Sequence, residues 1–139
     1  MAWVGGQISW RCSKSQTALP TAGGIFEVTQ QDDTLIVVPT VDLRELEYQR
    51  IEEGAREILE RLNGTGVKNV VLDFHKTDYY GSTALGLFLK LLKRVRRQNG
   101  HMAFCNVSDH EKEILQITKL DHSWPICSSR SEALEAVKH

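Results

Sequence analysis

Cysteine is scarce in this chain and forms no recognisable pattern. The three cysteines, Cys12, Cys105 and Cys127, are odd in number, lie far apart and include no Cys-x-x-Cys pair. Disulfide frameworks and structural zinc sites need paired spacings, so the sequence predicts neither, and we expect no metal. Reduced thiols are typical of the cytoplasm, where we therefore expect the protein to reside.

Long apolar runs and an excess of one charge are also missing. The sequence has no run of the roughly 18 apolar residues that cross a membrane, and its N-terminus lacks the basic and apolar regions of a signal peptide. The net charge of −1 at pH 7 favours neither a nucleic-acid-binding protein nor an acidic tail. We therefore expect no membrane insertion and no nucleic-acid partner.

Motifs that hold phosphate are absent as well. The chain has no Walker A sequence, and Gly64-x-Gly66 lacks the remainder of the dinucleotide-binding pattern G-x-G-x-x-G. These two glycines also precede an apolar, strand-like run, whereas that pattern opens a helix. We therefore expect no nucleotide and no other cofactor.

A serine hydrolase is the enzyme class that needs explicit comparison. Ser82 has His75 and Asp78 close by in the sequence. The nucleophile elbow of that class is G-x-S-x-G on a strand-to-helix turn, with the acid and the histidine usually after the serine. The five residues centred on Ser82 are Tyr-Gly-Ser-Thr-Ala, so neither glycine is in place. A small serine hydrolase stays an alternative, but we expect the protein not to be an enzyme.

A single domain accounts for most of the chain. Its 139 residues are 41% hydrophobic, which suits one core. Residues 1–23 lack a clear period, and three roles stay open for Trp3 and Trp10: packing on the domain, covering an edge strand, or reaching a neighbouring copy in a homodimer. We assign residues 1–23 to an irregular N-terminal extension and residues 24–139 to the domain.

Hydrophobic periodicity predicts nine elements in the order β-β-α-β-α-β-α-β-α. The predicted strands cover residues 25–30, 34–38, 67–74, 102–107 and 124–127. The predicted helices cover residues 43–62, 82–98 and 111–118, with a last helix from its cap at Ser129 through Val137. Helical crossovers imply parallel strand pairs, so only the first hairpin should be antiparallel. The sequence thus predicts an α/β fold with a mixed, mostly parallel sheet.

Short polar side chains stand where each predicted helix begins. Such side chains accept hydrogen bonds from the unpaired N–H groups of the first helical turn. The predicted caps are Asp42, Ser82 or Thr83, Ser108 with Asp109, and Ser129.

Ser82 stands at the start of a predicted helix, after a predicted buried strand and a short loop. The positive end of the helix dipole favours an anion at this point, so a hydroxyl there is well placed for phosphorylation. We predict Ser82 as the phosphorylation site, with Thr83 as the second choice. A plain helix cap at Ser82 stays open as the alternative.

Two further groups of residues are candidates for binding a partner. Tyr79 and Tyr80 precede Ser82, and each suits either the core or an exposed contact, with one of each a consistent arrangement. No acidic residue interrupts positions 82–100, which carry a basic cluster: Lys90, Lys93, Arg94, Arg96 and Arg97. This cluster is either a solvated helix face or a docking patch for an acidic protein.

The residues that carry a family resemblance are spread over positions 24–139. An apolar strand, Asn69-Val70-Val71-Leu72-Asp73, is followed after a loop by Gly81-Ser82-Thr83-Ala84-Leu85-Gly86. Further pieces are Gln98-Asn99-Gly100, Phe104-Cys105-Asn106-Val107-Ser108, Leu115-x-Ile117-Thr118-x-Leu120 and Ser129-x-Ser131-Glu132-Ala133-Leu134. In this order and spacing the chain resembles the STAS domain, the fold of bacterial anti-sigma factor antagonists. That family has a strand ending in Asp or Asn, a loop, and then Asp-Ser-Ser/Thr-Gly-Leu-Gly.

The resemblance implies a signalling protein that switches by phosphorylation. The family's phosphorylated serine falls on Ser82, and its partner is an anti-sigma factor, often a serine kinase, which binds the unmodified protein. Gly81 replaces the family's Asp, and Ala84 replaces its first Gly. A STAS-like module of a transporter or stress-signalling assembly, without phosphorylation, stays an alternative. We assign partner binding to Asp42, Tyr79, Tyr80, Gly81, Ser82, Thr83, Lys93, Arg94 and Arg97.

Overall fold

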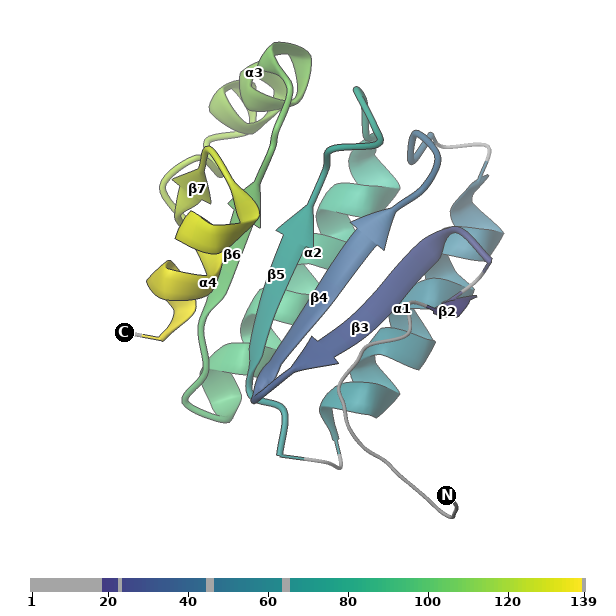
Figure 1. Ribbon diagram of the computed structural model, residues 1–139. Coiled ribbons are helices and arrows are strands. Elements are labelled where there is room, and N and C mark those ends of the chain that lie inside the picture. The colour runs from purple at the N-terminus through teal and green to yellow at the C-terminus, as the bar shows by residue number, and fades with distance from the viewer. Residues whose placement is uncertain (1–18, 23, 45–46, 64–65, 139) are drawn as a thin grey trace.

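A sheet forms the centre of the molecule, and six of its strands lie in the described residues (Figure 1). The computed structural model describes residues 19–22, 24–44, 47–63 and 66–138. The strands are β2 (Leu19–Ala22), β3 (Phe26–Gln31), β4 (Thr34–Pro39), β5 (Asn69–Asp73), β6 (Met102–Cys105) and β7 (Ile126–Cys127). The helices are α1 (Tyr48–Leu62), α2 (Ser82–Arg97), α3 (Asp109–Ile117) and α4 (Arg130–Val137).

The spatial order of the strands is β2-β3-β4-β5-β6-β7. β4, β5, β6 and β7 pair in parallel, and β3 pairs antiparallel with β4, as predicted. The helix and strand order from β3 onward also confirms the prediction and the α/β class. β4, β5 and β6 are buried along their whole length, which explains their continuous apolar sequences.

β2 corrects the prediction that everything before residue 24 is irregular. This strand adds a second antiparallel pair, with β3, and the register shifts between Pro20 and Ala22. Its four residues, Leu-Pro-Thr-Ala, show no alternation and include a proline. Proline has no N–H for a sheet and is tolerated on edge strands, and β2 is the outermost strand among the described residues. Trp3 and Trp10 lie outside the described residues.

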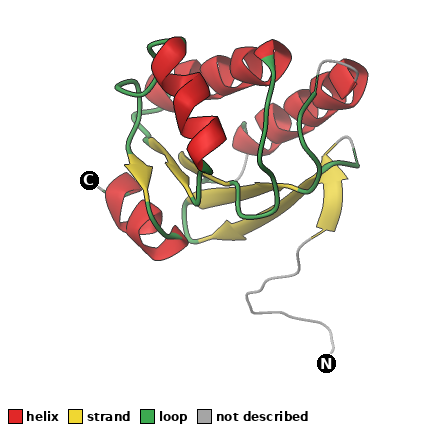
Figure 2. Ribbon diagram, turned by 90° about the horizontal axis from the view of Figure 1, so that it is seen from above, coloured by secondary structure: helices red, strands yellow, loops and turns green. Residues whose placement is uncertain are grey.

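The helices cover both faces of the sheet (Figure 2). α1 and α2 pack on one face over the larger core, and α4 packs on the other over a smaller cluster around Val71, Ala103 and Cys105. The aromatic rings of the larger core are in mutual contact, with centroids 5.1 Å apart for Phe88 and Phe104 and 4.5 Å apart for Phe104 and Trp124. None of the described helices is long and apolar enough to span a membrane.

The first helix starts later than predicted. The prediction placed residues 43–62 in one helix, but α1 begins at Tyr48 and its N-cap residue, Glu47, makes no side-chain cap. Leu43, only 1% exposed, instead forms a parallel bridge with Tyr80. The sheet-like pairing continues past β4 here because it buries an apolar side chain and satisfies backbone groups at once. Leu46 lies outside the described residues.

The remaining helix ends match their sequence signals. Ser108 accepts a hydrogen bond from the Glu111 N–H in a capping box, and Ser129 caps α4. Asp109 is the first residue of α3 and not its cap. Asn99 ends α2 with a φ of 60°, and Gly100 follows because a Cβ there would overlap the Lys68 carbonyl.

Candidate functional site around Ser82

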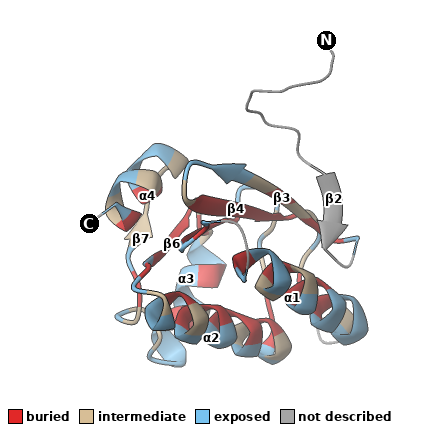
Figure 3. Cartoon of the chain, turned by 90° about the horizontal axis from the view of Figure 1, so that it is seen from below, coloured by how far each residue is buried: buried red, intermediate tan, exposed pale blue. Residues whose placement is uncertain are grey.

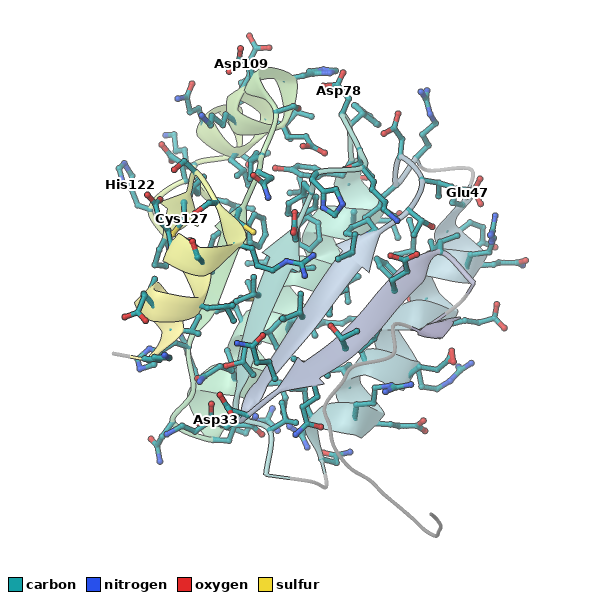
Figure 4. The ribbon with its side chains drawn as sticks, viewed as in Figure 1. Asp33, Glu47, Asp78, Asp109, His122 and Cys127 are labelled. Atoms are coloured by element: carbon teal, nitrogen blue, oxygen red, sulfur yellow. The ribbon has the colours of Figure 1, made fainter. Side chains whose placement is uncertain are left out.

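Three chain segments meet at the carboxyl ends of β4, β5 and β6. Because these strands are parallel, the residues that follow them lie at one edge of the sheet. The segments comprise residues 40–44, 74–81 and 106–108. Figure 4 shows Asp78 and Asp109 at this end and Asp33 at the opposite end. The residues predicted around Ser82 belong to the middle segment, which we call the Ser82 loop (residues 74–81).

The segment after β4 holds the Ser82 loop from one side. The Leu43 N–H donates to the Tyr79 carbonyl over 3.2 Å, and the Gly81 N–H donates to the Leu43 carbonyl over 2.8 Å. The Asp42 carboxylate accepts a 2.9 Å hydrogen bond from the Asp78 N–H. Asp42 therefore fixes the position of the loop, which corrects the prediction that it caps a helix.

The first turn of α3 holds the loop from the other side. The Thr77 hydroxyl donates to a Glu111 carboxylate oxygen over 2.8 Å. The Tyr80 hydroxyl donates to the Glu111 carbonyl over 2.9 Å. The Ser108 hydroxyl donates to the Asp78 carbonyl over 3.2 Å. With both sides hydrogen-bonded, the loop presents Ser82 from a fixed position.

Glu111 was not predicted as part of this site. Its side chain is 0% exposed, and its other carboxylate oxygen accepts a 3.0 Å hydrogen bond from the Ser108 N–H. Burial raises the pKa of Glu111, although the hydrogen bonds from Ser108 and Thr77 act in the opposite direction. The Ser-x-x-Glu capping box was a signal for it, but the contact with Thr77 spans 34 positions and depends on the fold.

The two adjacent tyrosines point in opposite directions. Tyr80 is only 1% exposed and packs against Phe74, with ring centroids 5.3 Å apart. Its assignment to partner binding is therefore wrong, because it fills the core beneath α2. Tyr79 is half-buried, with the Arg44 guanidinium 5.7 Å and the His110 ring 5.5 Å from its ring centre. Tyr79 and not Tyr80 contributes to the surface beside Ser82.

Ser82 is exposed and is the first residue of α2. Gly81, buried and extended with φ −104° and ψ −168°, takes the N-cap position, and no side chain caps this helix. The prediction that Ser82 or Thr83 is the cap is thus wrong. Within the described chain the Ser82 hydroxyl has no hydrogen-bond partner. It is left available to solvent and to other molecules.

A buried carboxylate lies at the end of β5, beneath the start of the loop. Asp73 is 2% exposed and accepts hydrogen bonds from Arg130 Nε at 2.9 Å, Asn106 Nδ2 at 3.0 Å and His75 Nδ1 at 3.0 Å. Burial raises the pKa of Asp73, but these hydrogen bonds outweigh that effect and hold it below its ordinary value. The apolar run before Asp73 predicts only that a strand ends there, whereas its partner Arg130 is 57 positions away.

The basic residues assigned to partner binding lie at the other end of α2. Lys93 and Arg97 follow Ser82 by eleven and fifteen positions, which is about 16 and 22 Å along a helix. Both are exposed, and Arg94 is half-buried. The structure therefore brings Asp42, Tyr79, Gly81, Ser82 and Thr83 together and leaves the basic residues apart from them.

Neither a metal site nor a hydrolase triad emerges from the residues that the structure describes. No group of three or more His, Cys, Asp or Glu side chains there could hold a metal ion. His75 is hydrogen-bonded to Asp73, and His110 lies 4.0 Å from Asp78. In the described ranges no histidine is hydrogen-bonded to Ser82, as a serine nucleophile requires.

Several proteins of known sequence are similar to this chain. BtrV of Bordetella bronchiseptica, by its name a candidate anti-sigma factor antagonist, is 32% identical over 73 residues, which are 52% of this chain and 63% of BtrV. The match to this relative thus spans less than two thirds of its length. A candidate anti-sigma factor antagonist of Thermotoga maritima is 23% identical over 107 residues, which are 77% of this chain and 92% of that protein.

Solved structures share the fold. An anti-sigma-factor antagonist (STAS) domain protein from Planctomyces limnophilus is 30% identical, with a TM-score of 0.72 over 82% of this chain and 98% of that one. The anti-sigma factor antagonist SpoIIAA in its unphosphorylated form is 17% identical, with a TM-score of 0.68 over 79% of this chain and 93% of that one. The model of the STAS domain matches residues 26–133, and the chain belongs to the STAS domain family.

Proposed function

We propose that this protein is a non-enzymatic anti-sigma factor antagonist that binds its partner through the Ser82 loop and the start of α2. The observation that supports this most is the exposed Ser82 hydroxyl, which lacks a partner in the described chain and follows a loop that is held from both sides. A rigid, exposed loop suits docking because little conformational entropy is lost on binding.

Phosphorylation of Ser82 is the proposed switch, and the anti-sigma factor is the proposed kinase. A phosphate adds nearly two negative charges at a position that the complex would bury. In the complex that charge would be desolvated and left without a partner. Phosphorylation would therefore dissociate the complex, and dephosphorylation would restore it.

Docking without phosphorylation is the second candidate, in a transporter or stress-signalling assembly. It is favoured by Gly81, which stands where the family has an Asp before the serine, and by Ala84, which stands where the family has a Gly. Ala84 is 0% exposed and belongs to the core, so it gives this first turn of α2 a fixed anchor.

Calorimetric titration of an anti-sigma factor captured from the native cell separates these candidates. Ser82→Ala should bind like the natural protein, and Ser82→Asp should bind at least about tenfold more weakly, because an unpaired charge must be desolvated. Ser131→Asp, an exposed serine in the first turn of α4, is the matched control and should bind normally. Equal affinity of Ser82→Asp and Ser131→Asp would rule out the switch. Incubation of the natural protein with the captured factor and ATP, followed by mass spectrometry, tests the kinase.

A further inference from the structure

A groove runs along the outer surface between α1 and α2. It consists of two adjoining hollows of about 240 and 350 Å³, which share Glu52, Ala55 and Lys90. Figure 3 shows the two helices side by side, with their buried sides toward the sheet and exposed sides outward. Ile51, Ala55 and Leu87 form a buried apolar floor in the first hollow, and half-buried Leu59 lines the second. The groove is therefore apolar at its base and open to solvent.

A glycine lines the groove where the fold itself gives no reason for one. Gly86 is exposed in the interior of α2, and apart from its chain neighbours and the backbone of its own helix, a Cβ at this position would meet no atom within 4 Å. Glycine is unfavourable inside a helix compared with alanine. Internal packing does not compensate for that cost at Gly86. Close approach of a second backbone is a physical reason for a bare position on a helix surface.

The α2 side of the groove continues as a basic stripe. Thr83, Gly86 and Lys90 line the first hollow, and Lys93 and Arg97 follow at the same three- and four-residue steps, so all five share one side of the helix. The sequence of α2, Ser82–Arg97, holds no acidic residue. Negative charge for this stripe must therefore come from outside α2.

The α1 side brings two acidic side chains, Glu52 and Glu60, and the basic Arg56 to the groove. Lys90 Nζ lies 3.9 Å from a Glu52 carboxylate oxygen, and both side chains are more than half exposed. An exposed pair of this length contributes little and is easily displaced. Lys93 and Arg97 make no ion pair with any described residue. The basic stripe is therefore free to face the acidic groups of another molecule.

We propose that this groove binds an amphipathic α-helix of a partner protein, with its apolar side chains on the groove floor and acidic side chains on the flank that faces α2. The groove spans Ile51 to Asn63, about 18 Å along α1, which matches three turns of a docked helix. Apolar anchors at positions i, i+3 or i+4, and i+7 suit such a groove. The inference extends the proposed docking surface, because Thr83 lines the groove next to Ser82, but it does not depend on phosphorylation.

A designed peptide tests the groove on the full chain. The probe is a helical peptide of about 18 residues, with leucines at the anchor positions and glutamates on one flank. In ¹⁵N–¹H spectra of the labelled protein, its addition should shift the amide signals of Leu59, Thr83, Gly86 and Lys90. A peptide with lysines in place of the glutamates should bind at least tenfold more weakly.

Matched variants test whether the peptide binds in the groove. Gly86→Leu should keep or raise the melting temperature, because leucine favours helices and meets open space, yet should weaken peptide binding at least tenfold. Glu53→Leu, on an exposed α1 position outside the groove, should bind normally. The double variant Lys93→Glu/Arg97→Glu should weaken binding by a similar factor, and Lys112→Glu on α3 should not.

Three results would overturn the inference. The first is equal affinity of Gly86→Leu and Glu53→Leu for the peptide, and the second is a set of shifted signals confined to another surface. The third is self-association of the natural protein that Gly86→Leu abolishes in sedimentation equilibrium, which would make the groove an interface between two copies. Ser82→Asp should bind the peptide normally, so failure of the groove and failure of the Ser82 switch are distinguished.

Discussion

At the scale of single residues, neighbouring positions in the Ser82 loop have opposite roles. Tyr79 is part of the surface, whereas Tyr80 lies in the core and donates to the Glu111 carbonyl. Tyr80→Phe should lower the free energy of unfolding by about 0.5–1.5 kcal/mol, because a buried carbonyl loses its donor. Tyr48→Phe, at a position of α1 that is 53% exposed, should leave it within about 0.5 kcal/mol. Urea unfolding of both variants measures the difference, and equal losses would contradict the buried, hydrogen-bonded placement of Tyr80.

The position of the N-cap of α2 leads to a second prediction. Since Gly81 and not Ser82 caps α2, Ser82→Ala should change the free energy of unfolding by less than about 0.5 kcal/mol. Ser108→Ala removes a true capping box and should cost about 0.5–2 kcal/mol. Ser82→Asp should gain about 0.3–1 kcal/mol from the helix dipole. Thermal and urea unfolding of the three variants provide the test, and a loss in Ser82→Ala as large as that in Ser108→Ala would show a cap at Ser82.

Two buried carboxylates should give opposite pH dependence. The pKa of Glu111 is raised above its unfolded value of about 4.5, so ionised Glu111 destabilises the fold and stability should increase as pH falls through the raised pKa. The pKa of Asp73 is lowered, so its stabilising contribution is complete above about 3.8 and is lost as pH falls through the lowered value.

Glu111→Gln isolates the first of these effects. Glutamine also completes a capping box, so the variant should be at least as stable as the natural protein at pH 7, with an advantage that shrinks as the pH falls. Glu113→Gln, on an exposed position of the same helix, is the control and should show no such trend. Urea unfolding between pH 4 and pH 8 makes the measurement. A stability difference that stays constant with pH would mean that Glu111 does not titrate differently on folding.

At the scale of elements, the sequence predicts segments whose burial follows one period. α2 and β5 are examples, because the first alternates faces with a helical period and the second is buried on both sides. The segment at residues 40–44 was predicted wrongly, because Leu43 also fits the helical stripe that follows, whereas its pairing with Tyr80 depends on a residue 37 positions away. Likewise, the site residues adjacent to Ser82 were predictable, but Glu111 and Asp73 gain their roles only through long-range contacts.

α4 depends on a polar anchor more than α1 and α2 do. Only Ala133 and Val137 of its residues are buried, and Arg130 in its first turn is paired with Asp73. Arg130→Ala should therefore increase amide hydrogen exchange in α4 before it affects α2. Lys138→Ala removes an exposed pair with Glu135 and should leave exchange unchanged. Mass spectrometry of exchanged peptides resolves the helices, and equal acceleration in α2 and α4 would contradict the anchoring role of Arg130.

At the scale of the whole molecule, the N-terminal boundary of the domain stays a prediction that β2 makes more specific. A chain of residues 19–139 keeps the β2–β3 pairing and should melt within a few degrees of the full protein. A chain of residues 24–139 should still fold, but it lacks β2 and leaves the edge of β3 unpaired, so it should melt lower and associate more readily. A drop of more than roughly 10 °C for the 19–139 chain would place part of residues 1–18 in the core.

The hydrogen bonds that hold the Ser82 loop from both sides also limit how far the lengths of the joined segments can vary. Residues 42 and 43, the loop itself and the first turn of α3 are joined by hydrogen bonds at fixed registers. One residue inserted between positions 74 and 81 would break both sets of bonds and rotate the first turn of α2. The hydrogen bonds between backbone groups of the turn at residues 119–123 instead go to the last turn of α3 and to the turn itself, so an insertion there would leave Ser82 in place. Relatives that use the same surface should accordingly keep unchanged lengths in the segments that correspond to residues 42–43, 74–81 and 106–111 and concentrate their length differences elsewhere.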